Sequence, residues 1–152
     1  MARLAHLNKI QASYLPAKDL YEETIKIIEK SFDTIQQETG IAQSGLGKAN
    51  QALGNYGTAK ESLVNALELN EHLFGKDHPR VGRNKRDLGK LYIDMSLDGK
   101  KKEEIKELYQ KALKEFEEAL AIFNKELPAG SPEIEDINKR IDWVKILIKQ
   151  NN

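Results

Sequence analysis

Apolar residues recur at intervals of three or four along almost the whole chain, and this spacing places them on one face of a helix. Prolines, glycines and short polar segments interrupt the stripes, and such residues end helices or form turns. We expect these interruptions at Pro16, Gly40, residues 54–57, residues 75–79, residues 98–102 and residues 128–131. The pattern therefore predicts an all-α chain of seven helices, and the short connections favour antiparallel neighbours.

Part of this pattern occurs twice, at a constant offset of 53 residues. Residues 116–122 align with residues 63–69, so that bulky and small side chains coincide. The connector that follows coincides as well, since residues 127–132 lie over residues 74–79. Self-similarity at such a distance is the signature of stacked helical hairpins.

Small residues stand at the positions where such hairpins must approach closely. Ala59 and Ala66 are seven residues apart and share one helix face, with Leu63 between them. Gly47 lies inside a predicted helix, where glycine costs about 1 kcal/mol relative to alanine. We expect Gly47 to let its helix approach the partner helix.

Two helix starts carry a local signal. His78 precedes Pro79, and Ser131 precedes Pro132, which is followed by acidic residues. Proline is favoured as the first helical residue, and carboxylates there interact well with the helix dipole. We therefore expect helices to begin at Pro79 and Pro132.

The repeated pattern resembles the tetratricopeptide family over about residues 4–132. The matching positions are Leu46, Gly47, Gly54, Tyr56, Ala59, Leu63 and Ala66 in the middle unit, Leu88, Gly89, Tyr92, Tyr109, Ala112, Phe116 and Ala119 in the third, and, in part, Ile10, Tyr14, Thr24, Ile28 and Ser31 in the first. The connector at residues 74–79 is similar to the longer linker of the kinesin-light-chain-like branch. That branch usually carries Asn where Asp87 stands.

This resemblance implies a tetratricopeptide-type α-solenoid that forms one domain over residues 1–152. Three helical hairpins would span about residues 3–38, 41–74 and 79–127, and a capping helix would span about residues 131–150. The third unit is longer, because Ala112 follows Gly89 by 23 positions whereas Ala59 follows Gly47 by 12. We expect a hairpin that projects beyond its neighbours and turns at Asp98–Lys102.

Composition narrows the class of protein. The 24 Lys and Arg residues balance the 24 Asp and Glu residues, which argues against general nucleic-acid binding. The chain has no cysteine, so it can form neither disulfides nor thiolate metal sites. No apolar run reaches the length of a membrane span, and the N-terminal residues do not form a signal peptide. We therefore expect a cytoplasmic protein without membrane association.

The sequence offers no catalytic constellation. His6, His72 and His78 are scattered and lack a second ligand at metal-binding spacing. The glycines between Gly40 and Gly47 do not form a phosphate-binding loop, because Leu46 stands where that motif requires lysine. We expect no enzyme activity, cofactor or metal.

Basic residues share one face of the third unit's first helix. Arg80, Arg83, Arg86 and Lys90 are spaced by three, three and four positions. The resemblance implies that first helices line a concave groove, so the peptide-binding residues would be Arg83, Arg86, Lys90, Lys48, Asn8 and Lys9. Guanidinium groups grip carboxylates bidentately, which would suit an acidic partner segment. An ordinary charged helix face is the alternative interpretation.

Two functions remain open at this point. The first is a protein-interaction scaffold that binds a partner peptide in its groove. The second is a structural repeat protein that self-associates into a homo-oligomer and has no separate peptide ligand. Trp143 bears on both, because it would either cover the end of the helix stack or anchor a contact with another protein.

Overall fold

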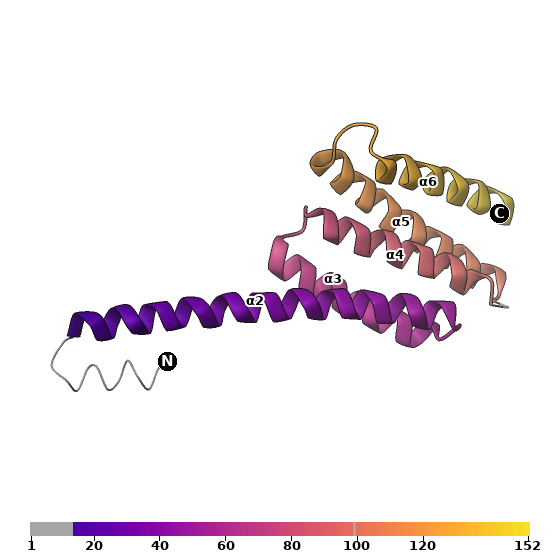
Figure 1. Cartoon of the computed structure of the whole chain (residues 1–152). Coiled ribbons are helices and arrows are strands. Elements are labelled where there is room, and N and C mark those ends of the chain that lie inside the picture. Colours follow the sequence, from indigo (N-terminus) through magenta and orange to yellow (C-terminus); the bar gives the residue numbers. More distant parts are fainter. Residues whose placement is uncertain (1–13, 99) are drawn as a thin grey trace. The chain divides into compact units, whose positions relative to one another are not determined.

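The computed structural model describes residues 14–98 and 100–152, without the side chains of residues 14–22, 24 and 28. The described residues form helices and no strand (Figure 1), which confirms the predicted all-α class. The helices are α2 (Tyr14–Ala52), α3 (Tyr56–Phe74), α4 (Pro79–Ser96), α5 (Lys102–Glu126) and α6 (Pro132–Asn151). The predicted stripe of residues 4–14 lies mostly outside the described residues.

The chain divides into two compact units, residues 1–38 and residues 39–152. The second unit holds the end of α2 and all of α3 to α6, and these helices pack in adjacent pairs as a tetratricopeptide-type α-solenoid. The predicted hairpins at residues 41–74 and 79–127 and the capping helix lie in this unit. The predicted first hairpin and the single domain over residues 1–152 stay predictions.

Two predicted helix ends are wrong, because α2 runs without a break from Tyr14 to Ala52. Pro16 lies in the first turn of α2, where the missing N–H costs no helical hydrogen bond. Gly40 lies inside α2, and a Cβ there would be 3.2 Å from the side-chain oxygen of Asn70 in α3. Close packing against α3 thus accounts for this glycine better than a helix end does.

The third hairpin, α4 and α5, is long as predicted. α5 has 25 residues against 19 in α3, and α4 ends at Ser96, followed by a turn before Lys102. The hairpin does not project beyond α6, however. The side-chain amide of Asn151 donates to the carbonyl oxygen of Lys102 at 3.3 Å, so α6 reaches the hairpin tip.

Both predicted helix starts are confirmed. Pro79 and Pro132 open α4 and α6, and His78 is the N-cap of α4. The Nδ1 atom of His78 accepts a hydrogen bond from the backbone N–H of Arg80 at 3.1 Å. The same imidazole stacks on Phe74 with ring centroids 4.5 Å apart, so the cap also fixes the connector.

The core of the second unit is built from small residues that receive large ones. Ala59 and Ala66 are fully buried, as are Ala112 and Ala119 at the matching positions of α5. A Cβ on Gly47 would lie 2.6 Å from Cγ of Leu63, which confirms that this glycine lets α2 approach α3.

The same arrangement recurs between α4 and α5. A Cβ on Gly89 would lie 2.5 Å from the Phe116 ring, and a Cβ on Gly82 would lie 2.6 Å from the Phe123 ring. Both rings are buried, at 1% and 0% exposure, so neither can move aside without disturbing the core. Glycine in the first helix and a large side chain in the second therefore set the spacing of each pair.

Two glycines of α2 test this packing directly. Gly47→Ala should lower the free energy of unfolding by about 1–3 kcal/mol, because the new methyl overlaps Leu63. Gly45→Ala is the matched control, since nothing lies within 4 Å of its Cβ position, and it should raise stability by about 0.5–1 kcal/mol. Urea unfolding followed by circular dichroism measures both values. Equal effects of the two substitutions would contradict the packing described.

Candidate functional site

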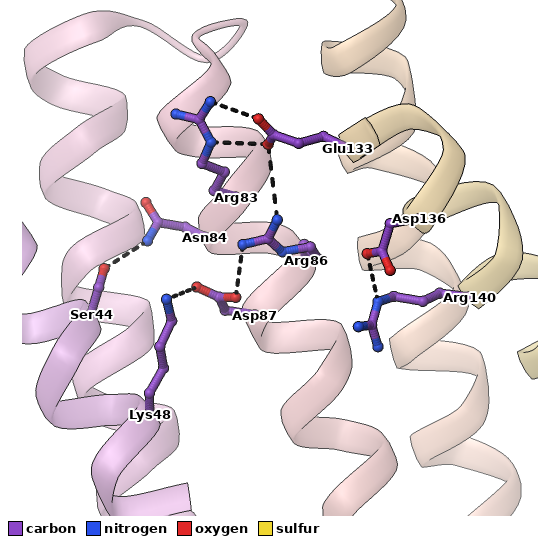
Figure 2. Close-up of polar contacts among 9 residues, drawn as sticks. All are labelled: Ser44, Lys48, Arg83, Asn84, Arg86, Asp87, Glu133, Asp136 and Arg140. Atoms are coloured by element: carbon purple, nitrogen blue, oxygen red, sulfur yellow. Dashed lines mark hydrogen bonds and ion pairs between the residues drawn. The ribbon is translucent and has the colours of Figure 1, made fainter. Parts of the chain in front are cut away.

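A hollow of about 390 Å³ lies between the end of α2 and the first half of α4. α2 contributes Ile41, Ser44 and Lys48, which are spaced by three and four residues and so share one face. α4 contributes the basic face predicted from the sequence, and the lining residues are Arg80, Arg83, Asn84, Arg86 and Asp87. Figure 2 shows the polar side chains of Ser44, Lys48, Arg83, Asn84, Arg86 and Asp87 together with three residues of α6.

Arg83 is held by a carboxylate from α6. Its Nε and Nη2 atoms donate to the two oxygens of Glu133 at 3.0 and 2.9 Å, in the bidentate geometry typical of guanidinium and carboxylate (Figure 2). Glu133 lies in the first turn of α6. The pair thus joins the start of the last helix to the middle of the helix stack.

Arg86 lies between two carboxylates. Its Nη1 atom is 3.9 Å from Glu133, and its Nη2 atom is 3.5 Å from Asp87 (Figure 2). Asp87 is only 4% exposed, and it also forms an ion pair with Lys48, whose Nζ atom is 3.4 Å from its Oδ2 atom. A buried carboxylate needs such partners, because an uncompensated charge in the interior is costly.

Below these ion pairs, hydrogen bonds between polar side chains hold α2, α3 and α4 in register. Asn70 of α3 donates to the side-chain oxygen of Asn84 at 2.6 Å, and Asn84 donates to the hydroxyl of Ser44 at 3.0 Å. Asn84 is 3% exposed. One side chain of α4 is therefore bonded to both α2 and α3.

Cations outnumber carboxylates around the hollow. Four cations, Lys48, Arg80, Arg83 and Arg86, line it, and Asp87 and Glu133 are the carboxylates that pair with them, although Arg80 instead lies over the Phe74 ring; the sum is a net charge of +2. Two buried donors, Nη1 of Arg80 and Nε of Arg86, have no hydrogen-bond partner among the described residues. Both positive charge and donor capacity are thus in excess.

A second hollow, of about 160 Å³, lies further along α4. Gln51 of α2, Lys90 and Asp94 of α4, Phe116 of α5 and Trp143 of α6 line it. Gln51 donates to Asp94 at 2.6 Å, whereas Lys90 forms no ion pair with a described residue. Trp143 is 49% exposed, so the structure favours its interpretation as a contact residue over that as a cover of the stack's end.

The structure thus divides the predicted peptide-binding residues into three groups. Arg83, Arg86 and Lys48 lie together at the larger hollow, but each is paired with a carboxylate. Lys90 lies at the smaller hollow. Asn8 and Lys9 lie outside the described residues.

Sequence reasoning missed the counterions. The helix dipole alone accounts for acidic residues after Pro132, such as Glu133, and the family pattern marks Asp87 only as a departure. The balance of 24 basic and 24 acidic residues is a signal that clustered arginines would have internal partners, but it does not identify them.

The pKa values of Arg83 and Glu133 reflect the hydrogen bonds between these two side chains. Hydrogen bonds from Arg83 lower the pKa of the Glu133 carboxyl, against the opposing effect of burial. The same bonds raise the pKa of Arg83. Glu133 therefore stays ionised at neutral pH, as a partner of two guanidinium groups must.

A comparison with known families identifies the helix pair formed by the end of α2 and by α3. A family model described as tetratricopeptide repeat matches residues 39–80, that is, the end of α2, α3 and the connector to α4. The chain contains a tetratricopeptide repeat. No curated protein matches the sequence.

The tetratricopeptide repeat contributes about half of the residues that line the larger hollow. The matched segment includes Ser44, Lys48 and Arg80, and the rest of the lining comes from α4. Repeats of this family generally bind other proteins, so the match supports a role in protein–protein interaction in general. Membership of the kinesin-light-chain-like branch stays a prediction.

Within residues 14–98 and 100–152, no group of three or more His, Asp or Glu side chains could hold a metal ion. In the same part of the chain, no helix combines the length and apolarity needed to cross a membrane.

Because Glu133 pairs with Arg83, we expect the stability difference between the original protein and a variant without this carboxylate to depend on pH. The pKa of Glu133 is lower in the folded chain than in the unfolded chain, where it is about 4.3, so its contribution is complete above that pH. It is lost as the pH falls through the folded value. Glu133→Gln should therefore lower the free energy of unfolding by about 1 kcal/mol at pH 7, and the difference should shrink as the pH falls through the folded pKa of Glu133.

Glu135→Gln is the control for this experiment. Glu135 lies in the same first turn of α6, but its carboxylate is exposed and pairs only with Lys139 at 3.6 Å. Urea unfolding at several pH values should show a smaller effect for Glu135→Gln. Equal effects of the two substitutions would mean that the interaction of Glu133 with the helix dipole, and not its pairing with Arg83, stabilises the fold.

Proposed function

We propose that this protein is a non-enzymatic scaffold that holds an acidic segment of a partner protein in the larger hollow. The tetratricopeptide repeat supports protein binding in general. The excess of positive charge at Lys48, Arg80, Arg83 and Arg86 supports an acidic partner, because complementary charge steers and orients association. The proposal requires no cofactor, metal, nucleic acid or membrane, and it places the protein in the cytoplasm.

The observation that carries the proposal is the pair of unpartnered guanidinium donors. Nη1 of Arg80 and Nε of Arg86 are buried and hydrogen-bonded to nothing in the described part of the chain. Buried donors are nearly always satisfied, so these two guanidinium groups keep unused hydrogen-bonding capacity. Arg80 and Arg86 line the hollow, and a carboxylate that enters it would offset the net charge of +2.

An incoming carboxylate would compete with an internal one. Glu133 already uses Arg83 and lies 3.9 Å from Arg86. Arg83 is 43% exposed, so a partner can reach it from solvent. Binding would therefore be weakened by Glu133 and strengthened when that carboxylate is removed.

The test uses a capped hexaglutamate peptide as probe and a capped hexaglutamine peptide as its neutral counterpart. Isothermal titration calorimetry at low salt should detect binding of hexaglutamate alone, and added salt should weaken it. The double substitution Arg83→Ala with Arg86→Ala should weaken binding by about tenfold or more, which corresponds to about 1.4 kcal/mol. Glu133→Gln should tighten it by about threefold.

Lys106→Ala with Lys111→Ala is the matched control. Both lysines are exposed on α5, and their removal changes the net charge by the same amount. This variant should bind hexaglutamate like the original protein. If the two double variants lose affinity equally, or if hexaglutamate does not bind, the acidic-segment proposal is wrong.

Self-association is a second candidate, favoured by apolar side chains on the first unit. Ile25, Ile27 and Phe32 of α2 are 53%, 47% and 58% exposed. Ile25 and Phe32 are seven residues apart and share one face of the helix; exposed apolar faces mark interaction sites in many proteins, and a second copy of the chain would offer the same surface.

Sedimentation velocity at several concentrations tests this second candidate. A homo-oligomer should form as the concentration rises, and Phe32→Glu should shift the distribution to monomer. Glu29→Gln, on the same part of α2, is a control that should leave the distribution unchanged. A monomer at all concentrations would leave the scaffold as the surviving function.

A further inference from the structure

The smaller hollow beside Trp143 has features that the acidic-segment proposal does not use. It combines an apolar floor, an indole and a lysine that forms no ion pair with a described residue, and all the residues that line it belong to the second unit. Phe116 and Ile93 are buried below it, at 1% and 6% exposure, and Trp143 stands at its edge with half of its surface exposed. Of the charged residues that line it, Asp94 accepts a hydrogen bond from Gln51 and Arg140 pairs with Asp136, which leaves the charge of Lys90 for a ligand. An apolar floor with a few polar groups around it is typical of a side-chain subsite.

We propose that this hollow is a specificity subsite, which takes one apolar side chain of the bound acidic segment against Trp143. The inference rests on the proposed function and adds a requirement for the ligand. The occupant is a segment of a partner protein with a leucine-sized or phenyl-sized side chain near its carboxylates.

The volume of the hollow limits the size of that side chain. A cavity of about 150 Å³ in another protein accommodates benzene. The hollow here is about 160 Å³ and therefore suits a Leu, Ile or Phe side chain. Tryptophan in contact with such a side chain is a common source of binding energy at protein interfaces.

The charge of Lys90 indicates that the neighbouring part of the ligand is acidic. Lys90 has no ion pair with a described residue, whereas Arg140 on the other wall is paired with Asp136 at 2.9 Å (Figure 2). Lys90 lies one turn of α4, or about 6 Å, beyond Arg86. A ligand carboxylate can therefore meet Lys90 when its neighbours lie over the larger hollow.

The distance between the two hollows sets the spacing in the ligand. From Arg86 to the middle of the smaller hollow, between Lys90 and Asp94, is about six residues of α4, or about 9 Å. An extended peptide covers this distance with about three residues. The side chain that enters the Trp143 hollow should thus lie two or three residues from the carboxylates that contact the arginines.

A symmetric probe peptide tests this spacing without assuming a direction. The probe is acetyl-Glu-Glu-Gln-Leu-Gln-Glu-Glu-amide, and its comparison peptide carries Ala in place of Leu. Trp143 is the single tryptophan of the chain, so its fluorescence reports on this hollow alone. The leucine peptide should shift the emission of Trp143 to shorter wavelength and, by calorimetry, should bind about tenfold more tightly than the alanine peptide.

Three substitutions assign the effect to the hollow. Trp143→Ala should reduce the preference for leucine over alanine to less than twofold. Lys90→Gln should weaken both peptides by about threefold to tenfold, because it removes one charge pair. Ile146→Ala is the control on the same helix, since Ile146 is 52% exposed and does not line the hollow, and it should change neither value.

The outcomes separate this inference from the proposed function. If both peptides bind equally, Trp143 emission is unchanged and Arg83→Ala with Arg86→Ala still weakens binding by about tenfold or more, then the acidic-segment proposal stands and the Trp143 subsite is overturned. If neither peptide binds by calorimetry, both proposals are overturned. A leucine preference that survives Trp143→Ala also overturns the subsite.

Discussion

Contact between a glycine of one helix and a large side chain of the next determines how the helices of the second unit pack. Gly47 receives Leu63, and Gly89 receives the ring of Phe116. The two glycines are 42 positions apart and the two large residues 53, so the contact follows the repeat. Protein interiors are close-packed and tolerate little added volume, which makes the missing methyl groups a structural requirement.

This contact also explains how α4 can serve the hollows. Gly82 and Gly89 face α5, and the residue after each, Arg83 and Lys90, is turned by about 100° around the helix. That turn brings the two cations to the side where α6 and the hollows lie. At the larger hollow, packing against α5 and the proposed binding therefore use different faces of α4, and substitutions on one face can leave the other intact.

The fold was predictable from local signals, whereas the site was predictable only in part. The helical stripes, the buried alanines and the role of Gly47 follow from spacing and side-chain size. The helix end predicted at Gly40 is wrong because the sequence alone does not distinguish a glycine that allows close packing from one that ends a helix. Glu133 lies 50 positions from Arg83, and no local pattern connects residues so distant before the fold is known.

The most direct test of the packing account is a double-mutant cycle at Gly89 and Phe116. The free energies of unfolding of Gly89→Ala, Phe116→Leu and the combined variant are measured in urea against the original protein. The account predicts that Gly89→Ala costs at least about 1 kcal/mol less when Phe116→Leu is present, because the smaller side chain leaves room for the new methyl. Additivity within about 0.5 kcal/mol would show that the two residues do not interact as described, and would contradict the account.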